Sequence, residues 1–470
     1  MKHPVVGSRS LTQQRALVIG AGLAGLLAAR VLLDHFASVA VIGRCRPSDN
    51  RPPGHVLAVG AFRALERLFP GIGAELALIG APSVDWTADC PALLPAGWAP
   101  RFPSGLLTRA VSGDGLAQTV RRRLTEYGGD RLELRDGVRA AGLLWQDGRV
   151  TGARLVVETA DDDSPTLIAV SADFVVFAGG QSSQLADWLA QAGCPAPAQT
   201  VISAPQAYSV GLFRRPASAD PAWRALLIVP AAGRPGALLH PLEGQRWAIT
   251  LAPPAGATPP ADLDALLTLV RDLPTPAVYD ALRAAEPLEP VCVWAHAGSR
   301  AAAYHRVGNW PDGLAITGDA VCALNPAYGH GLAAAALSAL AFAAALSEQR
   351  RAFPNGALDG LGQRAQSAQA AALRAPMRTA AAVEAWHAGS LGAAAARCGA
   401  ALLAAAADQP SAHRALLEVV TLTRPPAALL RPAVALQTLR GAPPLAVPSP
   451  IPPAPDPSAV RSTQELTVLS

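Results

Sequence analysis

The sequence predicts an α/β fold in which a Rossmann-like nucleotide-binding domain carries an inserted, mostly antiparallel β-sheet domain and is followed by a helical C-terminal region. Three observations lead to this prediction. A strand, a glycine-rich turn, a helix and a second strand follow one another within residues 16–42. Short apolar runs alternate with proline and glycine turns between residues 200 and 290, and an alanine-rich helical pattern extends over residues 357–442.

The N-terminal pattern is the most specific of the three. The apolar run 16–19 is followed at once by a G-x-G-x-x-G turn at Gly20, Gly22 and Gly25, then by a helical stretch and the second run 39–42. The first glycine permits a tight turn, the second lets the main chain approach a pyrophosphate, and the third allows close packing of helix on strand. The N-terminus of the helix attracts the anion. A dinucleotide-binding βαβ unit is therefore predicted here.

Later segments complete the predicted domain. Residues 173–177 form a buried strand that runs into a glycine turn, and residues 313–317 form another, followed by a motif and a long helix. We therefore expect a discontinuous nucleotide-binding domain, an inserted sheet, a helical region and a proline-rich tail that is disordered or draped over the surface. Their expected bounds are 12–190 with 291–350, then 191–290, 351–442 and 443–470.

Composition excludes several classes of protein. The chain has 470 residues, of which 51% are apolar and 16% charged, with a net charge of +4, so it is neither intrinsically disordered nor a typical nucleic-acid binder. Lys2 is the only lysine, which excludes Schiff-base chemistry and a P-loop. The six cysteines and nine histidines form no metal-ligand pattern, so no metal site is predicted.

The expected location is the cytoplasm. The N-terminus lacks the apolar core of a signal peptide, and the cysteines are scattered as in a reduced protein. The most membrane-like stretch, Gly331–Leu346, is alanine-rich and shorter than the ~20 residues of a spanning helix. We expect a buried helix and no transmembrane segment, and leave contact with a membrane surface open.

A second motif suggests a family. Gly318-Asp319-Ala320-Val321-Cys322 is followed by Asn325-Pro326-x-Tyr328-Gly329-His330-Gly331. Together with the N-terminal glycines, this segment resembles the FAD-dependent monooxygenases of the aromatic-hydroxylase and squalene-epoxidase superfamily, close to the bacterial polyether-type epoxidases. The resemblance spans residues 12–440 and implies a glutathione-reductase-type FAD-binding domain.

The resemblance also implies roles for particular residues. Gly20, Gly22 and Gly25 would line the FAD pyrophosphate, and Asp319 would accept hydrogen bonds from the ribityl chain. The remaining cofactor-binding candidates are Pro326 and the backbone of Gly329, His330 and Gly331 beside the flavin ring, with Arg44 and Arg109 elsewhere on the cofactor. No catalytic side chain is assigned, because the flavin would do the chemistry, and His330 and Tyr328 are the only candidates for such a role.

Three positions depart from the family pattern. Gly43 stands where the second strand should end in a ribose-binding acid, Phe177 stands where the middle motif has an aspartate, and Gly113 aligns with an arginine. At each of these positions FAD would lack a polar contact. Because the aspartate at the position of Phe177 is a signature of direct reduction by NAD(P)H, the electron source is either NAD(P)H or reduced flavin from a separate reductase.

The expected function is that of a flavin-dependent monooxygenase. It would hydroxylate or epoxidise an apolar small-molecule metabolite with O2 through a flavin C4a-hydroperoxide. Two alternatives remain open: a reductase of isoprenoid-type double bonds with the same fold, and a non-redox binding protein or cyclase whose FAD site has decayed.

Some further side chains have local expectations. Trp223, Trp247 and Trp294 are the candidates for a substrate pocket in the inserted sheet, although core packing is the commoner role of such residues. His296 and His305 are expected to be structural or exposed, and Cys322 buried and inert. His55 is a candidate for contact with cofactor or substrate.

Overall fold

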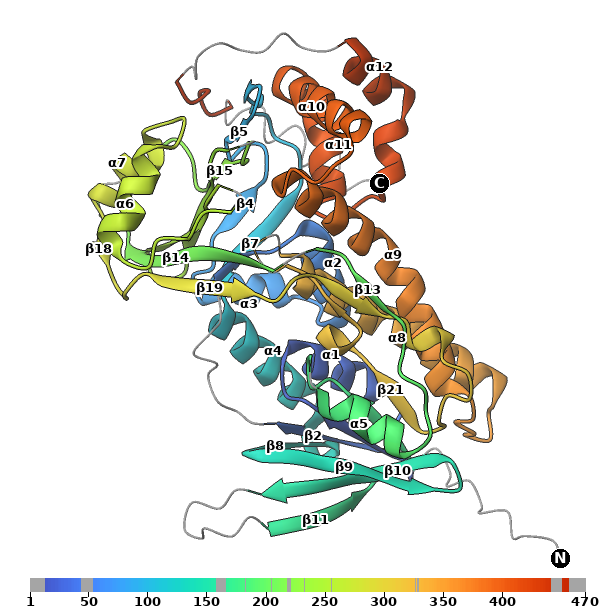
Figure 1. The fold of residues 1–470 in the computed structure, drawn as a ribbon. Coiled ribbons are helices and arrows are strands. Elements are labelled where there is room, and N and C mark those ends of the chain that lie inside the picture. Colours follow the sequence, from blue (N-terminus) through green and yellow to red (C-terminus); the bar gives the residue numbers. More distant parts are fainter. Residues whose placement is uncertain are drawn as a thin grey trace, which may run out of the picture.

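The structure is a computed structural model. It describes residues 13–43, 54–157, 166–181, 183–203, 205–217, 221–231, 233–254, 256–325, 327, 329–440 and 450–455, and at residues 55, 183, 439 and 440 it describes the main chain only. Figure 1 shows the arrangement of the elements.

A five-stranded parallel sheet forms the centre of the nucleotide-binding part. Its order is β21-β12-β1-β2-β8, and every neighbouring pair is parallel. The strands are β1 (Arg15–Ile19), β2 (Ser38–Gly43), β8 (Leu132–Asp136), β12 (Phe174–Phe177) and β21 (Leu314–Ile316). The predicted α/β class is confirmed by this sheet. Its strands come from three distant parts of the chain, as expected for a domain interrupted by an insertion.

Two apolar layers cover the sheet. On one face lie α1 (Leu23–Leu32), α4 (Gly113–Gly128) and α8 (His330–Ala352), with α2 (Val59–Leu68) and α3 (Ile72–Leu78) packed beside them. On the other face lies the antiparallel meander β9 (Val138–Gln146), β10 (Arg149–Val157) and β11 (Thr166–Ser171), with α5 (Ser183–Gln191). The parallel strands are thus buried on both faces, which explains their continuous apolar runs.

The antiparallel sheet is larger than the predicted insertion. Its order is β18-β14-β17-β16-β15-β5-β6, and β19 also pairs with β14. The strands from the insertion are β14 (Gln206–Arg214), β15 (Leu226–Ile228), β16 (Gly236–Leu242), β17 (Arg246–Ala252) and β18 (Glu286–Pro287). Three others come from outside 191–290, namely β5 (Ala92–Leu94), β6 (Gly97–Trp98) and β19 (Cys292–His296). Helices α6 (Leu263–Arg271) and α7 (Ala277–Arg283) complete its outer core.

Two small sheets connect these parts. One contains β3 (Gly54–Val56), β7 (Leu107–Ser112) and β4 (Ser83–Asp85), and the other contains β13 (Gln199–Val201), β20 (Arg300–Ala302) and β22 (Cys322–Ala323). They lie where the nucleotide-binding part meets the antiparallel sheet (Figure 1).

The C-terminal region is helical, as predicted. Helix α9 (Leu361–His387) contains Pro376 and runs from beside β21 to the group α10 (Ala393–Asp408), α11 (Pro410–Val420) and α12 (Pro432–Arg440) (Figure 1). Within the proline-rich tail, residues 450–455 lie against the body: Arg101 Nη1 donates to the carbonyl of Pro452 at 2.9 Å, and Ile451 packs on the core of the antiparallel sheet.

Helix α8 contains the apolar segment noted above. In the described part of the chain it is the one helix that is long and apolar enough to cross a membrane. Its alanines Ala333, Ala334 and Ala336 are buried, and it packs on α1, α2 and α9. Alanine on the contact face lets these helices approach closely.

Candidate functional site

The predicted glycine turn lies at the carboxyl edge of the parallel sheet. Gly20 directly follows β1 with φ 121°, and a Cβ atom there would lie 2.3 Å from the carbonyl oxygen of Ala178, which follows β12. Gly318, after β21, has φ 69°, and its Cβ would lie 2.6 Å from Ala24 Cβ on α1. The ends of three adjacent parallel strands therefore meet at one crevice, which is where open α/β sheets bind ligands.

The N-terminus of α1 fits a phosphate group. Gly22 is its N-cap, no side chain caps it, and its first turn carries no acidic residue. A Cβ at Gly25 would lie 1.8 Å from the carbonyl oxygen of Gly20, whereas a Cβ at Gly22 would have no atom within 4 Å. The unpaired N–H groups of the first turn thus border open space that an anion can occupy.

Asp319 lies beside this turn. It belongs to the short helix η4 (Gly318–Ala320), and its side chain is exposed. Desolvation by the surrounding protein nevertheless raises its pKa above the ordinary value. A carboxyl group that is accessible and yet surrounded by protein lies in a depression of the surface. Such a position suits a group that accepts hydrogen bonds from a bound cofactor.

The structure explains two of the three departures from the family pattern. A Cβ at Gly43 would lie 2.5 Å from Ala21 Cβ and 2.7 Å from Ala21 N, so this end of β2 leaves no room for a side chain. Phe177 is 2% exposed and packs edge-to-face on Trp188, with ring centroids 6.0 Å apart. Its side chain belongs to the apolar core under the sheet and is not available to a cofactor.

The third departure lies at the start of α4. Ser112 caps this helix, accepting a hydrogen bond from Gly115 N at 3.0 Å, and its own N–H donates to Glu243 Oε2 at 3.0 Å. Gly113 thus begins a helix whose N-terminal end is held by a carboxylate from the antiparallel sheet. Arg109, the predicted substitute for the missing arginine, donates from its Nη1 to the carbonyl of Ala81 at 3.1 Å, beyond α3.

Other predicted residues have mixed outcomes. Gly329, with φ 67°, is the N-cap of α8, and Gly331 lies in its first turn. The His330 ring points into the core, where its Nε2 donates to the carbonyl of Val420 at 2.9 Å, and burial lowers its pKa. His330 therefore ties α8 to α11 as a neutral ring, a poor arrangement for acid–base catalysis. Arg44, Pro326, Tyr328 and the His55 side chain lie outside the described residues.

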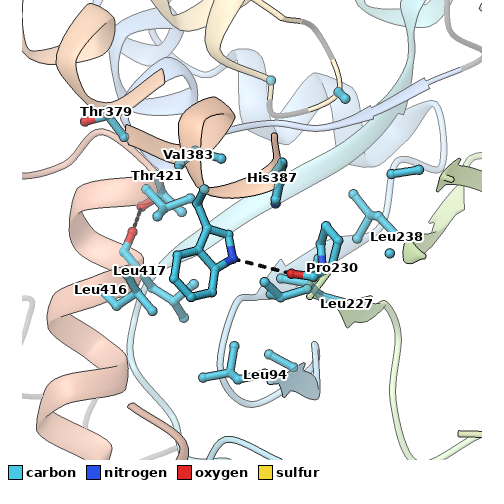
Figure 2. Close-up of a pocket in the computed structure, with 18 of the residues that line it drawn as sticks. Leu94, Leu227, Pro230, Leu238, Thr379, Val383, His387, Leu416, Leu417 and Thr421 are labelled. Atoms are coloured by element: carbon cyan, nitrogen blue, oxygen red, sulfur yellow. Dashed lines mark hydrogen bonds between the residues drawn. The ribbon is translucent and has the colours of Figure 1, made fainter. Parts of the chain in front are cut away.

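A cavity of about 460 Å³ lies beside the N-terminus of α8. Gly329, Gly54 and Val56 line one end, the strands β15–β17 form one wall, and helices α9–α11 form the wall opposite. Figure 2 shows residues of both walls. Those that it labels are Leu94, Leu227, Pro230, Leu238, Thr379, Val383, His387, Leu416, Leu417 and Thr421. The cavity size and its apolar walls are those of a small-molecule site.

Of the three tryptophans predicted as pocket candidates, one lines this cavity and two lie in the core. Trp294 lines it and stacks on Tyr208, another lining residue, with ring centroids 6.0 Å apart. Trp247 and Trp223 instead stack on each other in the outer core of the antiparallel sheet. The sequence reasoning missed Trp86 and Trp386, which also line the cavity. Trp386 connects the two walls, because its Nε1 donates to the carbonyl of Pro230 at 3.4 Å, a bond drawn in Figure 2.

Cys322 and His296 lie in buried surroundings. Burial raises the pKa of Cys322 to about 12, as expected for a thiol in the core. His296 is buried and stacks on Trp294. Within the described ranges, no group of three or more His, Cys, Asp or Glu residues could hold a metal ion.

Acid should weaken the fold through His413. This ring is 2% exposed, its Nδ1 donates to the carbonyl of Pro100 at 3.1 Å, and burial lowers its pKa to about 4. Below pH 6.5 the unfolded chain takes up a proton that the folded chain refuses until about pH 4, so stability falls as the pH drops through this window. Between pH 7.5 and 5 the loss from this ring is about 2 kcal/mol.

Urea unfolding of wild type and His413→Phe at the two pH values measures this effect. The phenylalanine keeps an aromatic ring beside Phe102 and does not titrate. The acid-induced loss of unfolding free energy should therefore be smaller in the variant by about 2 kcal/mol. An equal loss in both proteins would assign the acid sensitivity to other groups.

Comparison with known proteins gives the family. The family described as FAD binding domain matches residues 13–375. Protein Rv3254 of Mycobacterium tuberculosis is 28% identical over 358 residues, which are 70% of this chain and 72% of that protein.

Solved structures share the fold at low identity. The flavin-dependent brominase Bmp2 has a TM-score of 0.63 at 14% identity, covering 90% of this chain and 97% of its own. PqsL of Pseudomonas aeruginosa, described as a probable FAD-dependent monooxygenase, has 0.61 at 18%, covering 80% and 97%. The p-nitrophenol 4-monooxygenase PnpA of Pseudomonas putida has 0.61 at 17%, covering 91% and 98%. With its glycine crevice, Asp319 and the family match, the chain belongs to the FAD-binding domain family.

Proposed function

We propose that this protein is a flavin-dependent monooxygenase that hydroxylates or epoxidises an apolar small molecule held in the cavity between the antiparallel sheet and helices α9–α11. One observation carries the proposal: Gly329, the N-cap of α8, lines the cavity. The family resemblance puts the flavin ring at this same segment, so the substrate site and the expected redox centre adjoin.

The described residues fit FAD at its central part. The N–H groups at the start of α1, next to Gly22, would hold the pyrophosphate, and Asp319 would accept from the ribityl hydroxyls. Helix α8 begins at Gly329 without a side-chain cap, so its N–H groups and dipole would favour negative charge on the nearby flavin edge. When bound, FAD supplies activation of O2 and transfer of one oxygen atom, which no side chain of the protein supplies.

The cavity itself would position the substrate and exclude water. Its walls are almost entirely aliphatic and aromatic, and Arg378, the one charged residue among the described residues that line it, is exposed to solvent. Away from Arg378, a charged substrate would lose hydration without compensation, whereas an apolar one gains by leaving water. This supports an apolar metabolite as the substrate.

We further propose that FAD binds mainly through main-chain groups and that a separate reductase supplies the electrons. Gly43 leaves no space for the ribose-binding acid, and Phe177 is committed to the core. Each missing polar contact typically costs about 0.5–1.5 kcal/mol, so FAD should bind more weakly than in a complete site and exchange readily. A cofactor that exchanges can be reduced elsewhere and delivered.

FAD titration of the purified protein, followed by flavin fluorescence, tests the proposal together with an oxygen-consumption assay. Saturable FAD binding is expected, and Asp319→Asn should weaken it about tenfold, because the amide is a poorer acceptor. Asp130→Asn, at an exposed turn far along the chain, is the matched control and should bind FAD like wild type. If the protein shows no bound flavin after addition of saturating FAD, the monooxygenase proposal is wrong.

The alternatives predict different results. A binding protein or cyclase with a decayed FAD site is favoured by Gly43 and Phe177, and stoichiometric FAD binding with oxygen-dependent product formation would exclude it. A reductase of isoprenoid-type double bonds would use the same apolar cavity. Turnover under anaerobic conditions with reduced flavin would identify the reductase, since a monooxygenase requires O2.

A further inference from the structure

We propose that the cavity takes an apolar ligand that ends in a single carboxylate, and that Arg378 on α9 binds this group at the edge of the cavity. The inference rests on the proposed function, since it treats this cavity as the substrate site. It adds a chemical class to that function: an apolar body with one anionic end.

Arg378 belongs to the row of α9 side chains that faces the cavity. Residues 378, 382 and 386 follow one another at intervals of four, so their side chains lie on the same face of the helix. Ala382 and Trp386 line the cavity, and so does Arg378. Trp386 reaches the opposite wall, where its Nε1 donates to the carbonyl of Pro230 (Figure 2). The row therefore faces the antiparallel sheet across the cavity.

The guanidinium of Arg378 is available to a ligand. Its side chain is exposed, and within the described ranges no ion pair, hydrogen bond or aromatic ring holds it. On the neighbouring α11, by contrast, Arg414 Nε pairs with Glu418 Oε1 at 3.2 Å. A guanidinium carries a full positive charge and a planar fork of N–H donors, which matches both oxygens of a carboxylate.

The cavity contains no negative charge to balance Arg378. The described residues that line it include no aspartate or glutamate. Burial lowers the pKa of His387 and His413 to about 4, so these rings are neutral at physiological pH. The buried Glu384 of α9 does not line the cavity, and its Oε1 accepts a hydrogen bond from Ser299 Oγ at 2.6 Å. The uncompensated positive charge favours an anion at this edge.

An apolar wall with one cation at its edge suits a ligand with two unlike ends. A carboxylate at the exposed Arg378 keeps part of its hydration and gains charge-assisted hydrogen bonds, while the apolar body leaves water. A neutral ligand of the same shape lacks the ion pair. Because this pair is exposed, it should contribute a modest preference that salt weakens.

The test compares 1-pyrenebutyrate with 1-pyrenebutanol, which share the ring and the chain length and differ in charge. Fluorescence titration of the full chain without added flavin gives both affinities. At low ionic strength, wild type should bind the butyrate about fivefold more tightly than the alcohol. At about 0.5 M salt the preference should fall below about twofold, because salt screens an exposed ion pair.

Two variants remove the charge in different ways. Arg378→Gln keeps a polar side chain, and Arg378→Met keeps an unbranched apolar one. Each should reduce the preference for the butyrate at low ionic strength to below about twofold, with the affinity for 1-pyrenebutanol unchanged. The unchanged affinity for the alcohol shows that the cavity is intact.

Arg374→Gln is the matched control. Arg374 lies one turn earlier in the same row of α9, is also exposed, and does not line the cavity. This variant therefore changes the net charge of the protein as much as Arg378→Gln does. The fivefold preference for the butyrate should persist in Arg374→Gln.

Four results would overturn the proposal: equal binding of the two probes by wild type, a preference that survives both Arg378 variants, an equal loss of preference in Arg374→Gln, or no binding of either probe. Because the measurement needs no redox chemistry, its outcome is separate from that of the monooxygenase proposal. A carboxylate preference that depends on Arg378, in a protein that never oxidises a substrate, would refute the monooxygenase proposal and leave this one standing.

Discussion

Gly25→Ala should abolish FAD binding and destabilise the protein, whereas Gly22→Ala should lose FAD affinity without losing stability. A Cβ at residue 25 would lie 1.8 Å from the carbonyl oxygen of Gly20, so the turn between β1 and α1 must shift. At residue 22 the Cβ meets no protein atom within 4 Å, and φ is −73°, which alanine adopts freely. The methyl group would instead occupy the space where the pyrophosphate approaches.

Thermal melts and FAD titrations of the two variants separate these effects. For Gly22→Ala we expect an unfolding free energy within about 0.5 kcal/mol of wild type and an FAD affinity at least about 100-fold weaker. For Gly25→Ala we expect a loss of several kcal/mol, in the range of overpacked sites. Unchanged FAD affinity in Gly22→Ala would show that the cofactor does not lie against this turn.

Replacing Phe177 by aspartate, the residue that the family pattern has at this position, should unfold the protein instead of strengthening its FAD binding. In Phe177→Asp a carboxylate would replace a ring that is 2% exposed, beside Trp188 and Leu185 in the core under the parallel sheet. The lost ring costs about 3–5 kcal/mol, and burying an unpaired charge adds to this. Such a sum is comparable to the whole stability of many domains.

Soluble yield and urea unfolding check this expectation, with Phe177→Leu as the control. Leucine keeps an apolar side chain and should cost only about 1–2 kcal/mol, so Phe177→Leu should fold. If Phe177→Asp folded and bound FAD more tightly than wild type, residue 177 would have to face the cofactor, contrary to its place in the core.

The sequence was most informative where local chemistry determines structure. The turn Gly20–Gly25 and the motif at Gly318-Asp319 lie at strand ends, as predicted. Glycine marks these places in the sequence, because residues 20 and 318 combine close main-chain approach with φ of about 70–120°. The alternation of apolar runs also indicated the antiparallel sheet. Its recruitment of β5 and β6 was missed, since a two- or three-residue strand has no periodicity to detect.

Side-chain direction could not be predicted from the sequence. The sequence predicted only a main-chain place for His330 beside the flavin, and it gave no sign that the ring turns toward α11 and Val420, a partner 90 residues away. Trp247 and Trp294 have the same residue type in the same sheet, but one lies in the core and the other in the cavity wall. Residues 379–421 supply much of that wall, and their alanine-rich helices show no sequence signal for the surface that they cover. Such contacts depend on tertiary packing, which a local pattern does not encode.

The central sheet also has a consequence for how the protein is made. Strand β1 pairs with β12, and β12 with β21, so neighbours in the sheet are about 150 residues apart in the chain. During synthesis the crevice cannot close until Asp319 has left the ribosome, and loop closure over such separations is slow. Until then β12 lacks its neighbour β21, and the apolar surface at this edge of the sheet exposes the nascent chain to aggregation. Free FAD can stabilise only the completed chain, and so cannot assist the earlier steps of folding.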